Sequence, residues 1–277
     1  MKEHPAPQNY SGPLKGVILD WAGTVIDYGS CAPVAAFREV FRGAGVEITV
    51  TEAREPMGMA KRDHIAAVLA LPAVRERWTR ARGGSPTDDD VDHLYGQFQP
   101  AQLRCLTRYG ELIPGTVDTI ATCRRRGLKI GSSTGYTRQL MEVVLAEAAR
   151  QGFQPDAVLC ADDIHVGRPA PWMCFENARR MDIFPMSAIV KVDDTSVGVE
   201  AGRNAGMWSV GVTLSGNLVG LTLDEIQRHD PEDLRGQIAA AEERLRSAGA
   251  HFTVNTIADL PPVLDEIESR LRGGETP

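Results

Sequence analysis

One stretch of the sequence decides the predicted fold: Leu14-Lys15-Gly16-Val17-Ile18-Leu19-Asp20-Trp21-Ala22-Gly23-Thr24. Its apolar run, residues 17–19, is typical of a strand that is buried on both faces of a sheet. The run stops at Asp20, which would lie at the carboxyl edge of the sheet, where open α/β folds bind ligands. In the Gly23-Thr24 turn that follows, backbone N–H groups are free to meet an anion. This arrangement indicates that Asp20 is a nucleophile or a metal ligand; the alternative is an aspartate that only ends the strand.

The composition disfavours several classes of protein. The chain has 277 residues, a formal net charge of -7 and five cysteines. An acidic chain is not typical of nucleic-acid-binding proteins, and no apolar run approaches the ~20 residues that span a bilayer. The cysteines are odd in number and form no C-x-x-C pair, which favours reduced thiols. We therefore expect a cytoplasmic protein that acts on a small molecule, with no nucleic-acid or membrane partner.

The order of the predicted elements indicates an α/β core with an inserted helical domain. After the first strand, the chain is predicted to be helical, with no convincing strand, as far as about residue 107. Further strands then alternate with helices, at residues 128–132, 157–160, 188–192 and 208–213. This alternation predicts a doubly wound, mostly parallel sheet. We expect residues 1–28 and 108–277 to form the core domain and residues 29–107 to form a helical cap domain.

The helical block contains a lysine that could do chemistry, on a helix predicted from Met59 to Leu71. Lys61 and His64 are three residues apart and so lie on one face of that helix. Met57 and other apolar neighbours would partly desolvate the ammonium group of Lys61, which lowers its pKa. A neutral amine can attack an aldehyde to form a Schiff base, and His64 is placed to move protons. The alternative is a solvated surface lysine.

Two further stretches suit a phosphate group. The first, Ser132-Ser133-Thr134-Gly135-Tyr136-Thr137, joins a strand end to a helix start. The hydroxyl of Thr134 and the N–H of Gly135 could donate to an anion there, and Tyr136 could line the pocket. In the second, Gly167-Arg168-Pro169, the guanidinium of Arg168 could offset the charge of a carboxylate and a phosphoryl group. The alternatives are a plain helix cap at Thr137 and an exposed loop arginine.

A second apolar strand also ends in carboxylates, in the stretch Ile189-Val190-Lys191-Val192-Asp193-Asp194-Thr195. Mg²⁺ takes oxygen ligands and keeps several of its waters, so two carboxylates and one backbone carbonyl would hold it. Asp20 and Asp194 could supply the carboxylates. An Asp-Asp pair alone would be weak evidence, but four motifs in this order, each at a predicted strand end, are strong evidence.

These motifs resemble those of the haloacid dehalogenase superfamily, whose phosphotransferases usually read D-x-D-G-T where this chain has Asp20-Trp21-Ala22-Gly23-Thr24. In family phosphatases the second aspartate protonates the departing alcohol, so Ala22 argues against ordinary phosphate-ester hydrolysis. The variant motif, the cap stretch around Lys61 and the arginine before Pro169 are similar to the phosphonoacetaldehyde hydrolase (phosphonatase) family. The resemblance covers the chain from about Lys15 to Ile257.

The resemblance implies an activity: hydrolysis of the carbon–phosphorus bond of phosphonoacetaldehyde to acetaldehyde and phosphate. It implies a Schiff base on Lys61, an aspartyl-phosphate on Asp20, and Mg²⁺ held by Asp20, Asp194 and the carbonyl of Ala22. The residues that it implies for substrate binding are Met57, His64, Thr134, Gly135, Tyr136 and Arg168. It also implies a homodimer that forms through the cap domain, where the helix face of Val34, Phe37 and Phe41 is either the dimer contact or intradomain core.

Two residues depart from the family pattern, and two other functions remain open. Asp193 stands where glycine is common, and Gly198 stands where a further acidic residue is frequent. The first alternative is a phosphomonoesterase or phosphotransferase of the same superfamily, which Ala22 disfavours. The second is a non-catalytic sensor of a phospho-ligand, which the intact Asp20 and Lys61 disfavour.

Overall fold

A six-stranded sheet, with strand order β3-β2-β1-β4-β5-β6, forms the centre of the molecule. All five neighbouring pairs of strands run parallel. The strands are β1 (Gly16–Leu19), β2 (Lys129–Ser133), β3 (Ala157–Leu159), β4 (Ile189–Asp193), β5 (Trp208–Val212) and β6 (Phe252–Val254). The computed structural model describes residues 10–277, apart from the side chains of residues 106–108, so residues 1–9 of the predicted core domain lie outside the described residues.

The middle strand, β1, is the point where the order of the strands reverses. Its last residue, Leu19, lies opposite Ser132 of β2 on one side and opposite Val192 of β4 on the other. Parallel strands in this register end at the same edge of the sheet, so the residues that follow them lie together. Open α/β folds bind ligands at such a reversal.

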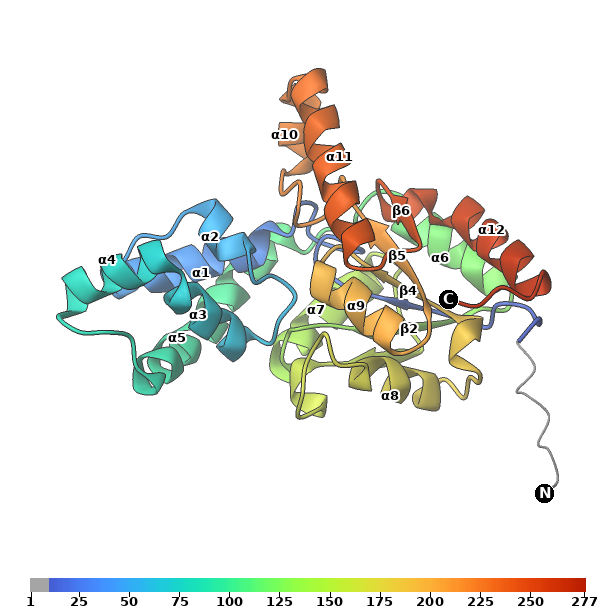
Figure 1. The fold of residues 1–277 in the computed structure, drawn as a ribbon, viewed down its shortest axis with the longest axis horizontal. Helices are drawn as coiled ribbons and strands as arrows, with labels where there is room; N and C mark the ends of the chain where they lie inside the picture. The colour runs from blue at the N-terminus through green and yellow to red at the C-terminus, as the bar shows by residue number, and fades with distance from the viewer. Residues whose placement is uncertain (1–9) are drawn as a thin grey trace.

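Helices cover both faces of the sheet (Figure 1). Val17 and Leu19 of β1 pack into one apolar cluster with residues of α6, α7 and α12, whereas Ile18 packs into another with residues of α8 and α9. These helices are α6 (Thr116–Arg125), α7 (Arg138–Arg150), α8 (Trp172–Arg180), α9 (Ser196–Asn204) and α12 (Leu260–Arg272). Because neighbouring residues of a strand point to opposite faces, the continuous apolar run of β1 supplies both clusters, and the predicted doubly wound α/β class is confirmed.

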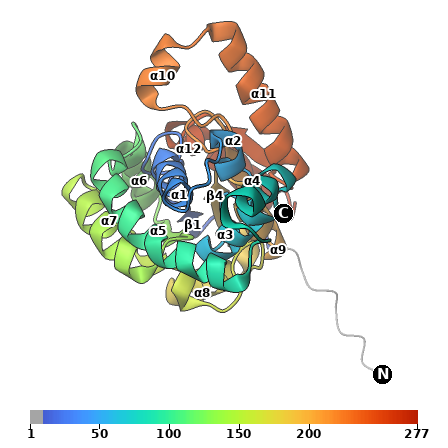
Figure 2. The same cartoon turned by 90° about the vertical axis from the view of Figure 1, so that its left-hand side faces the viewer.

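The remaining core elements are short or lie partly beyond the sheet. Helix α10 (Leu223–Arg228) projects beyond it, and α11 (Pro231–Ser247) runs from there back to contact β5 and β6 (Figures 1 and 2). Three short 3₁₀ segments cover Ala161–Asp163, Met186–Ala188 and Ile257–Asp259. Within residues 10–277, none of the helices combines the length and the apolar character that crossing a membrane requires.

A bundle of helices lies at one end of the sheet, between β1 and β2 in the sequence (Figure 1). Its helices are α1 (Cys31–Gly43), α2 (Val50–Arg54), α3 (Lys61–Ala70), α4 (Pro72–Arg82) and α5 (Asp88–Tyr109). The bundle has an apolar cluster of its own, drawn from residues 34–101. That separate core is the basis on which we infer that residues 29–107 form a cap domain.

Two features of the bundle differ from the sequence-based expectations or decide between them. The predicted helix from Met59 begins at Lys61, because residues 55–58 form turns and Met59 a bend, with a φ of +95° at Gly58. Lys61 is therefore the first residue of α3. The helix face of Val34, Phe37 and Phe41 is buried inside the bundle, so it is intradomain core.

Candidate active site

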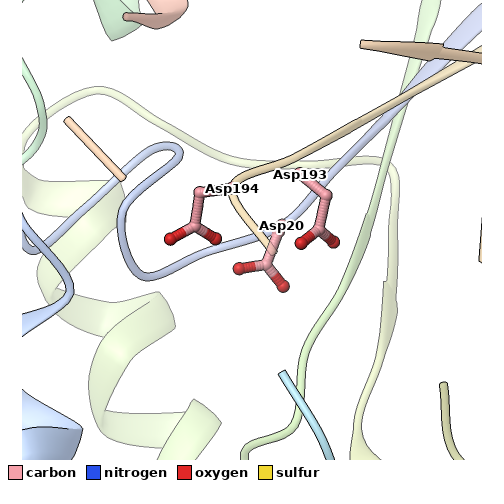
Figure 3. Close-up of side chains that lie close together, drawn as sticks. All are labelled: Asp20, Asp193 and Asp194. Carbon is pink, nitrogen blue, oxygen red and sulfur yellow. The ribbon is translucent and has the colours of Figure 1, made fainter. Parts of the chain in front are cut away.

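Three aspartates lie side by side where β1 and β4 end (Figure 3). Asp20 follows β1, Asp193 is the last residue of β4, and Asp194 comes next. One carboxylate oxygen from each residue lies within 4.8 Å of the others, and all three side chains are buried. A buried cluster of like charges at such short range requires cations to balance it.

Asp194 fits the role of a metal ligand. Its Oδ2 accepts a hydrogen bond of 2.7 Å from the backbone N–H of Asn217, but its buried Oδ1 has no partner among the described residues. Burial, followed by the charges of Asp20 and Asp193, raises the pKa of Asp194 well above its usual value. A divalent cation would satisfy the unpaired oxygen and the charge together. Ala22 lines the same cavity as both Asp20 and Asp194, as a carbonyl ligand would.

Asp193 is committed to protein groups instead. Its Oδ2 accepts hydrogen bonds from Arg168 Nη1 at 2.9 Å and from Lys191 Nζ at 2.7 Å. Its Oδ1 accepts from the N–H and the hydroxyl of Thr195, at 3.0 and 2.7 Å. Burial alone would raise the pKa of Asp193, but Lys191 and Arg168 more than offset this and hold it below its usual value. The carboxylate is therefore an anchor for two buried cations.

Arg168 joins this anchor to the predicted nucleophile. Its Nη2 donates to Asp20 Oδ1 at 2.7 Å and to the carbonyl of Ser133 at 3.2 Å, while its Nη1 contacts Asp193. The residue is only 6% exposed, which excludes the alternative of an exposed loop arginine. A guanidinium held in this way can offset charge on both a carboxylate and an incoming phosphoryl group.

Lys61 reaches the same cavity from the cap. Its Nζ lies 5.6 Å from the ring centre of Phe37 and 5.7 Å from that of Tyr136. Burial, helped by the charge of Arg168, lowers the pKa of Lys61 to about 8, although Asp20 and Asp194 act in the opposite direction. The position of Lys61 at the start of α3 also lowers its pKa, since a helix N-terminus disfavours a positive charge. The alternative of a solvated surface lysine is excluded by an exposure of 6%.

The cavity brings together nearly all the residues that the sequence singled out. The predicted residues that line it are Asp20, Ala22, Met57, Lys61, Thr134, Gly135, Tyr136, Arg168 and Asp194. Its free volume is about 20 Å³, which is room for about one water molecule. The cap is therefore closed over the site, and a substrate of several heavy atoms requires it to open.

The loop after β2 joins that strand to α7 and lines the cavity through Thr134, Gly135 and Tyr136. Thr134 Oγ1 accepts a hydrogen bond of 3.1 Å from the N–H of Tyr136. Thr137 occupies the cap position of α7 but its side chain makes no capping bond; the N–H of Arg138 instead donates to Asp162. A Cβ on Gly135 would lie 3.9 Å from Lys61 Cε, so this loop directly adjoins the lysine.

His64 lies outside the cavity lining. Its Nε2 donates to the carbonyl of Ala53 at 2.9 Å, and its ring stacks on Phe37 with centroids 3.9 Å apart. Burial, followed by the charge of Lys61, lowers the pKa of His64 well below 6.5. The structure places a neutral imidazole in the core of the cap, and the roles in substrate binding and proton transfer stay predictions.

Three residues that the sequence reasoning missed also shape the site. Lys191 is a fully buried cation in the middle of β4, and a lysine inside an apolar strand could have been noticed. Arg54, at the end of α2, donates to the carbonyls of Gly29 and Gly220 and to the side chain of Asn217. It therefore ties the cap to the core. No sequence signal identifies that contact.

Gly58 is the third of these residues. Its φ of +95° favours glycine, and a Cβ there would lie 2.5 Å from Thr195 Oγ1 and 2.6 Å from Val197 Cγ2. The cap loop can therefore touch the core beside Asp194 only because position 58 has no side chain. A glycine among methionines, directly before a predicted helix, is the sequence signal that could have marked it.

The chain is similar to known proteins in sequence and in fold. The family model described as haloacid dehalogenase-like hydrolase matches residues 14–206. A phosphonoacetaldehyde hydrolase of Syntrophobacter fumaroxidans is 46% identical over 268 residues, which cover 97% of each chain. One of Bacillus cereus is 44% identical over 257 residues, 93% of this chain and 97% of that one. The crystal structure of a phosphonoacetaldehyde hydrolase-like protein from Oleispira antarctica has a TM-score of 0.97 at 39% identity, covering 99% of this chain and 100% of that one.

Proposed function

The chain belongs to the haloacid dehalogenase-like hydrolase family, and we propose that it hydrolyses the carbon–phosphorus bond of phosphonoacetaldehyde to acetaldehyde and phosphate. One observation carries the proposal: a cap lysine with a lowered pKa and a strand-end aspartate line one small cavity. The names of its full-length relatives support the same substrate. Phosphonoacetaldehyde has an aldehyde at one end and a phosphoryl group at the other, which matches the two groups.

The first half of the proposed reaction belongs to Lys61. Its neutral amine adds to the aldehyde carbon, and loss of water from the adduct gives a protonated imine. Breaking the carbon–phosphorus bond directly would expel a carbanion, which is a very poor leaving group. The imine accepts that electron pair, so the leaving group becomes a neutral enamine.

The second half belongs to Asp20. One carboxylate oxygen attacks phosphorus in line with the bond that breaks, the electron pair of that bond moves into the imine, and an aspartyl-phosphate forms. Arg168 balances charge on the carboxylate and the phosphoryl group, and Thr134 and Gly135 donate to phosphoryl oxygens. Because carbon rather than an alcohol departs, no acid is required at position 22, which is consistent with Ala22.

Two hydrolyses complete the cycle. The enamine takes up a proton on carbon to return to an imine, and water converts the imine to acetaldehyde and the free amine of Lys61. A second water releases phosphate from Asp20. The water lost on imine formation balances one of these, so the net reaction consumes one water. We assign to His64 the support of proton transfers around Lys61.

The metal in this proposal is Mg²⁺, held by Asp20, Asp194 and the carbonyl of Ala22. When bound, it supplies positive charge beside the phosphoryl oxygens. The unpaired Oδ1 of Asp194 is the structural support for this assignment. We further propose a cytoplasmic homodimer that forms through the cap. The free thiols of Cys31, Cys123, Cys160 and Cys174 are consistent with a reducing compartment, and the mass in solution tests the assembly.

The proposed activity is tested by measuring phosphate and acetaldehyde together from phosphonoacetaldehyde, with p-nitrophenyl phosphate as the competing substrate. We expect the two products in equal amounts and little turnover of the ester. Efficient ester hydrolysis without acetaldehyde release would instead identify a phosphomonoesterase. Binding of phosphonoacetaldehyde without turnover of either compound would identify a sensor.

Replacing Asp194 by asparagine is expected to weaken Mg²⁺ binding about 100-fold, since one of two charged ligands becomes a neutral amide. Isothermal titration with Mg²⁺ measures the affinity directly, and the Mg²⁺ concentration for half-maximal phosphate release gives a second value. Asp118→Asn, on an exposed part of α6, is the matched control. An affinity unchanged by Asp194→Asn would show that the metal is held elsewhere.

Replacing Gly58 by alanine is expected to lower kcat/KM for phosphonoacetaldehyde about 10- to 100-fold, because the methyl group meets Thr195 and Val197 and holds the cap away from Asp20. Steady-state kinetics measure the effect. Gly84→Ala is the control, because a Cβ at that exposed loop glycine has no neighbour within 4 Å. Equal kinetics for the two variants would show that the cap need not close as tightly as in this structure.

A further inference from the structure

We propose that Asp193 is a positioning residue for Arg168, and that its carboxylate occupies the space that a side chain at position 198 would fill. The proposal rests on the function proposed above. It concerns the two departures that the sequence shows from the family pattern, an acid at 193 and a glycine at 198. The structure makes them one feature, because either position can supply the carboxylate but both together cannot.

The space beside Gly198 is already filled by another side chain. This residue lies in the first turn of α9 and is buried. A Cβ there would lie 1.9 Å from Cγ, 2.0 Å from Oδ2 and 2.1 Å from Oδ1 of Asp193. Gly198 is not among the described residues with a positive φ, so its backbone conformation does not require glycine. The carboxylate of Asp193 is what excludes a side chain at position 198.

The carboxylate of Asp193 holds two cations in place. Asp193 Oδ2 accepts from Arg168 and Lys191, and Oδ1 is fixed by Thr195. The other terminal nitrogen of Arg168 points to Asp20. Each terminal nitrogen of the Arg168 guanidinium is therefore held by a carboxylate. The position of Arg168 relative to Asp20 depends on its bond to Asp193.

Removal of the carboxylate would leave both cations short of a partner. Without Asp193, Arg168 would keep only Asp20 as an ion-pair partner among the described residues, and Lys191 would lose its only one. Arg168 would then reorient or admit water, and the phosphoryl site would lose its geometry. The contacts and charges that act on Lys61 do not include Asp193, so Schiff-base formation in the cap is expected to survive.

The experiment is a reciprocal exchange of the two residues. Asp193→Gly and Gly198→Asp are each expected to lower kcat for phosphate release about 100-fold, the first by loss of the anchor and the second by collision with it. The double variant Asp193→Gly/Gly198→Asp is expected to recover at least about tenfold over either single variant. Asp193→Gly/Gly236→Asp is the matched control, because Gly236 is a helical glycine with open space around it, and it is expected to show no recovery.

Three readouts keep the outcome clear. Thermal unfolding identifies a variant that fails to fold. If Asp193→Gly does not fold, Asp193→Asn, which keeps the shape of the side chain, takes its place in the comparison of activities. Borohydride trapping with acetaldehyde reports on Lys61 and is expected to be unchanged in every folded variant. The affinity for inorganic phosphate, measured by titration calorimetry, is expected to fall in the single variants and to return in the double variant.

Additive losses in the double variant, in both kcat and phosphate affinity, would overturn the proposal, because two carboxylate positions that exchange roles cannot act independently. So would an unchanged kcat and phosphate affinity in folded Asp193→Asn. A wild-type protein that releases no acetaldehyde would count against the proposed function alone. The phosphate affinities of the wild type, the two single variants and the double variant would still test whether positions 193 and 198 exchange the carboxylate.

Discussion

Replacing Lys61 by arginine will abolish the release of acetaldehyde and phosphate from phosphonoacetaldehyde, with a loss of at least about 10⁴-fold in kcat. A guanidinium keeps the positive charge beside Asp20 and Arg168, so the electrostatic balance of the cavity is retained. It cannot lose a proton in a protein and so cannot attack the aldehyde. Product assays measure the loss, and Lys15→Arg, at an exposed lysine, is the control.

The same substitution will remove the covalent adduct that borohydride traps. In the wild type, treatment with borohydride in the presence of substrate should leave a stable adduct on Lys61, visible by peptide mass. The variant should yield no adduct at any residue of the site. An adduct on another lysine, or turnover within tenfold of the wild type, would refute the assignment of Lys61.

The pKa of Lys61 adds a pH dependence with a definite sign. Only the neutral amine attacks, so with a pKa of about 8 the rate of imine formation rises with pH through that value. At pH 7 about 300-fold more of the amine is neutral than for an ordinary lysine with a pKa of 10.5. A plot of kcat/KM against pH should therefore rise with an inflection near 8, and an inflection above 10 would show that the cavity does not lower this pKa.

The sheet and its polar edge could be predicted because both depend on local pattern. The sequence predicts parallel strands that end at or just before Asp20, Thr134 and Asp194, and the carboxyl ends of parallel strands meet at one edge of a sheet without further information. The register of β1, with Leu19 opposite both Ser132 and Val192, confirms that these ends coincide.

What could not be predicted depends on packing between the cap and the core. The helical period placed Lys61 within a helix, but the turn at Gly58 makes it the first helical residue, and only the contact of that turn with Thr195 reveals why. The pattern likewise placed Phe37 on the apolar face of a helix. It did not show that the ring of Phe37 packs inside the bundle, where it stacks on His64 and lies beneath the ammonium group of Lys61. A one-dimensional pattern identifies an apolar face but not its partner.

The network behind Asp20 shows the same limit in charged residues. The sequence leaves the role of Asp193 open, and its carboxylate lies within reach of the other two. Only the contacts with Arg168 and Lys191 show that its oxygens are already used. A pair of adjacent aspartates can therefore have two functions, and which one binds a metal depends on the cations that fold against them.

Replacing Asp20 by asparagine will stop phosphate release while leaving imine formation at Lys61 intact. The amide is nearly the same size as the carboxylate and can still accept a hydrogen bond from Arg168, but its oxygen is a far weaker nucleophile toward phosphorus. We expect a loss of at least about 10⁴-fold in phosphate release. Borohydride with substrate should still give an adduct on Lys61, now carrying the intact phosphonate, which differs in mass from the adduct left after cleavage.

The two variants thus divide the reaction at a defined bond. Lys61→Arg should lose the adduct and the products, whereas Asp20→Asn should lose only the products. Peptide mass must exclude conversion of the asparagine back to aspartate, which would restore activity slowly. Phosphate release by Asp20→Asn above about 1% of the wild-type rate, with the asparagine intact, would mean that water attacks phosphorus directly. In that case Arg168 and the metal ligands would be arranged around a water molecule, and the aspartyl-phosphate would have to be given up.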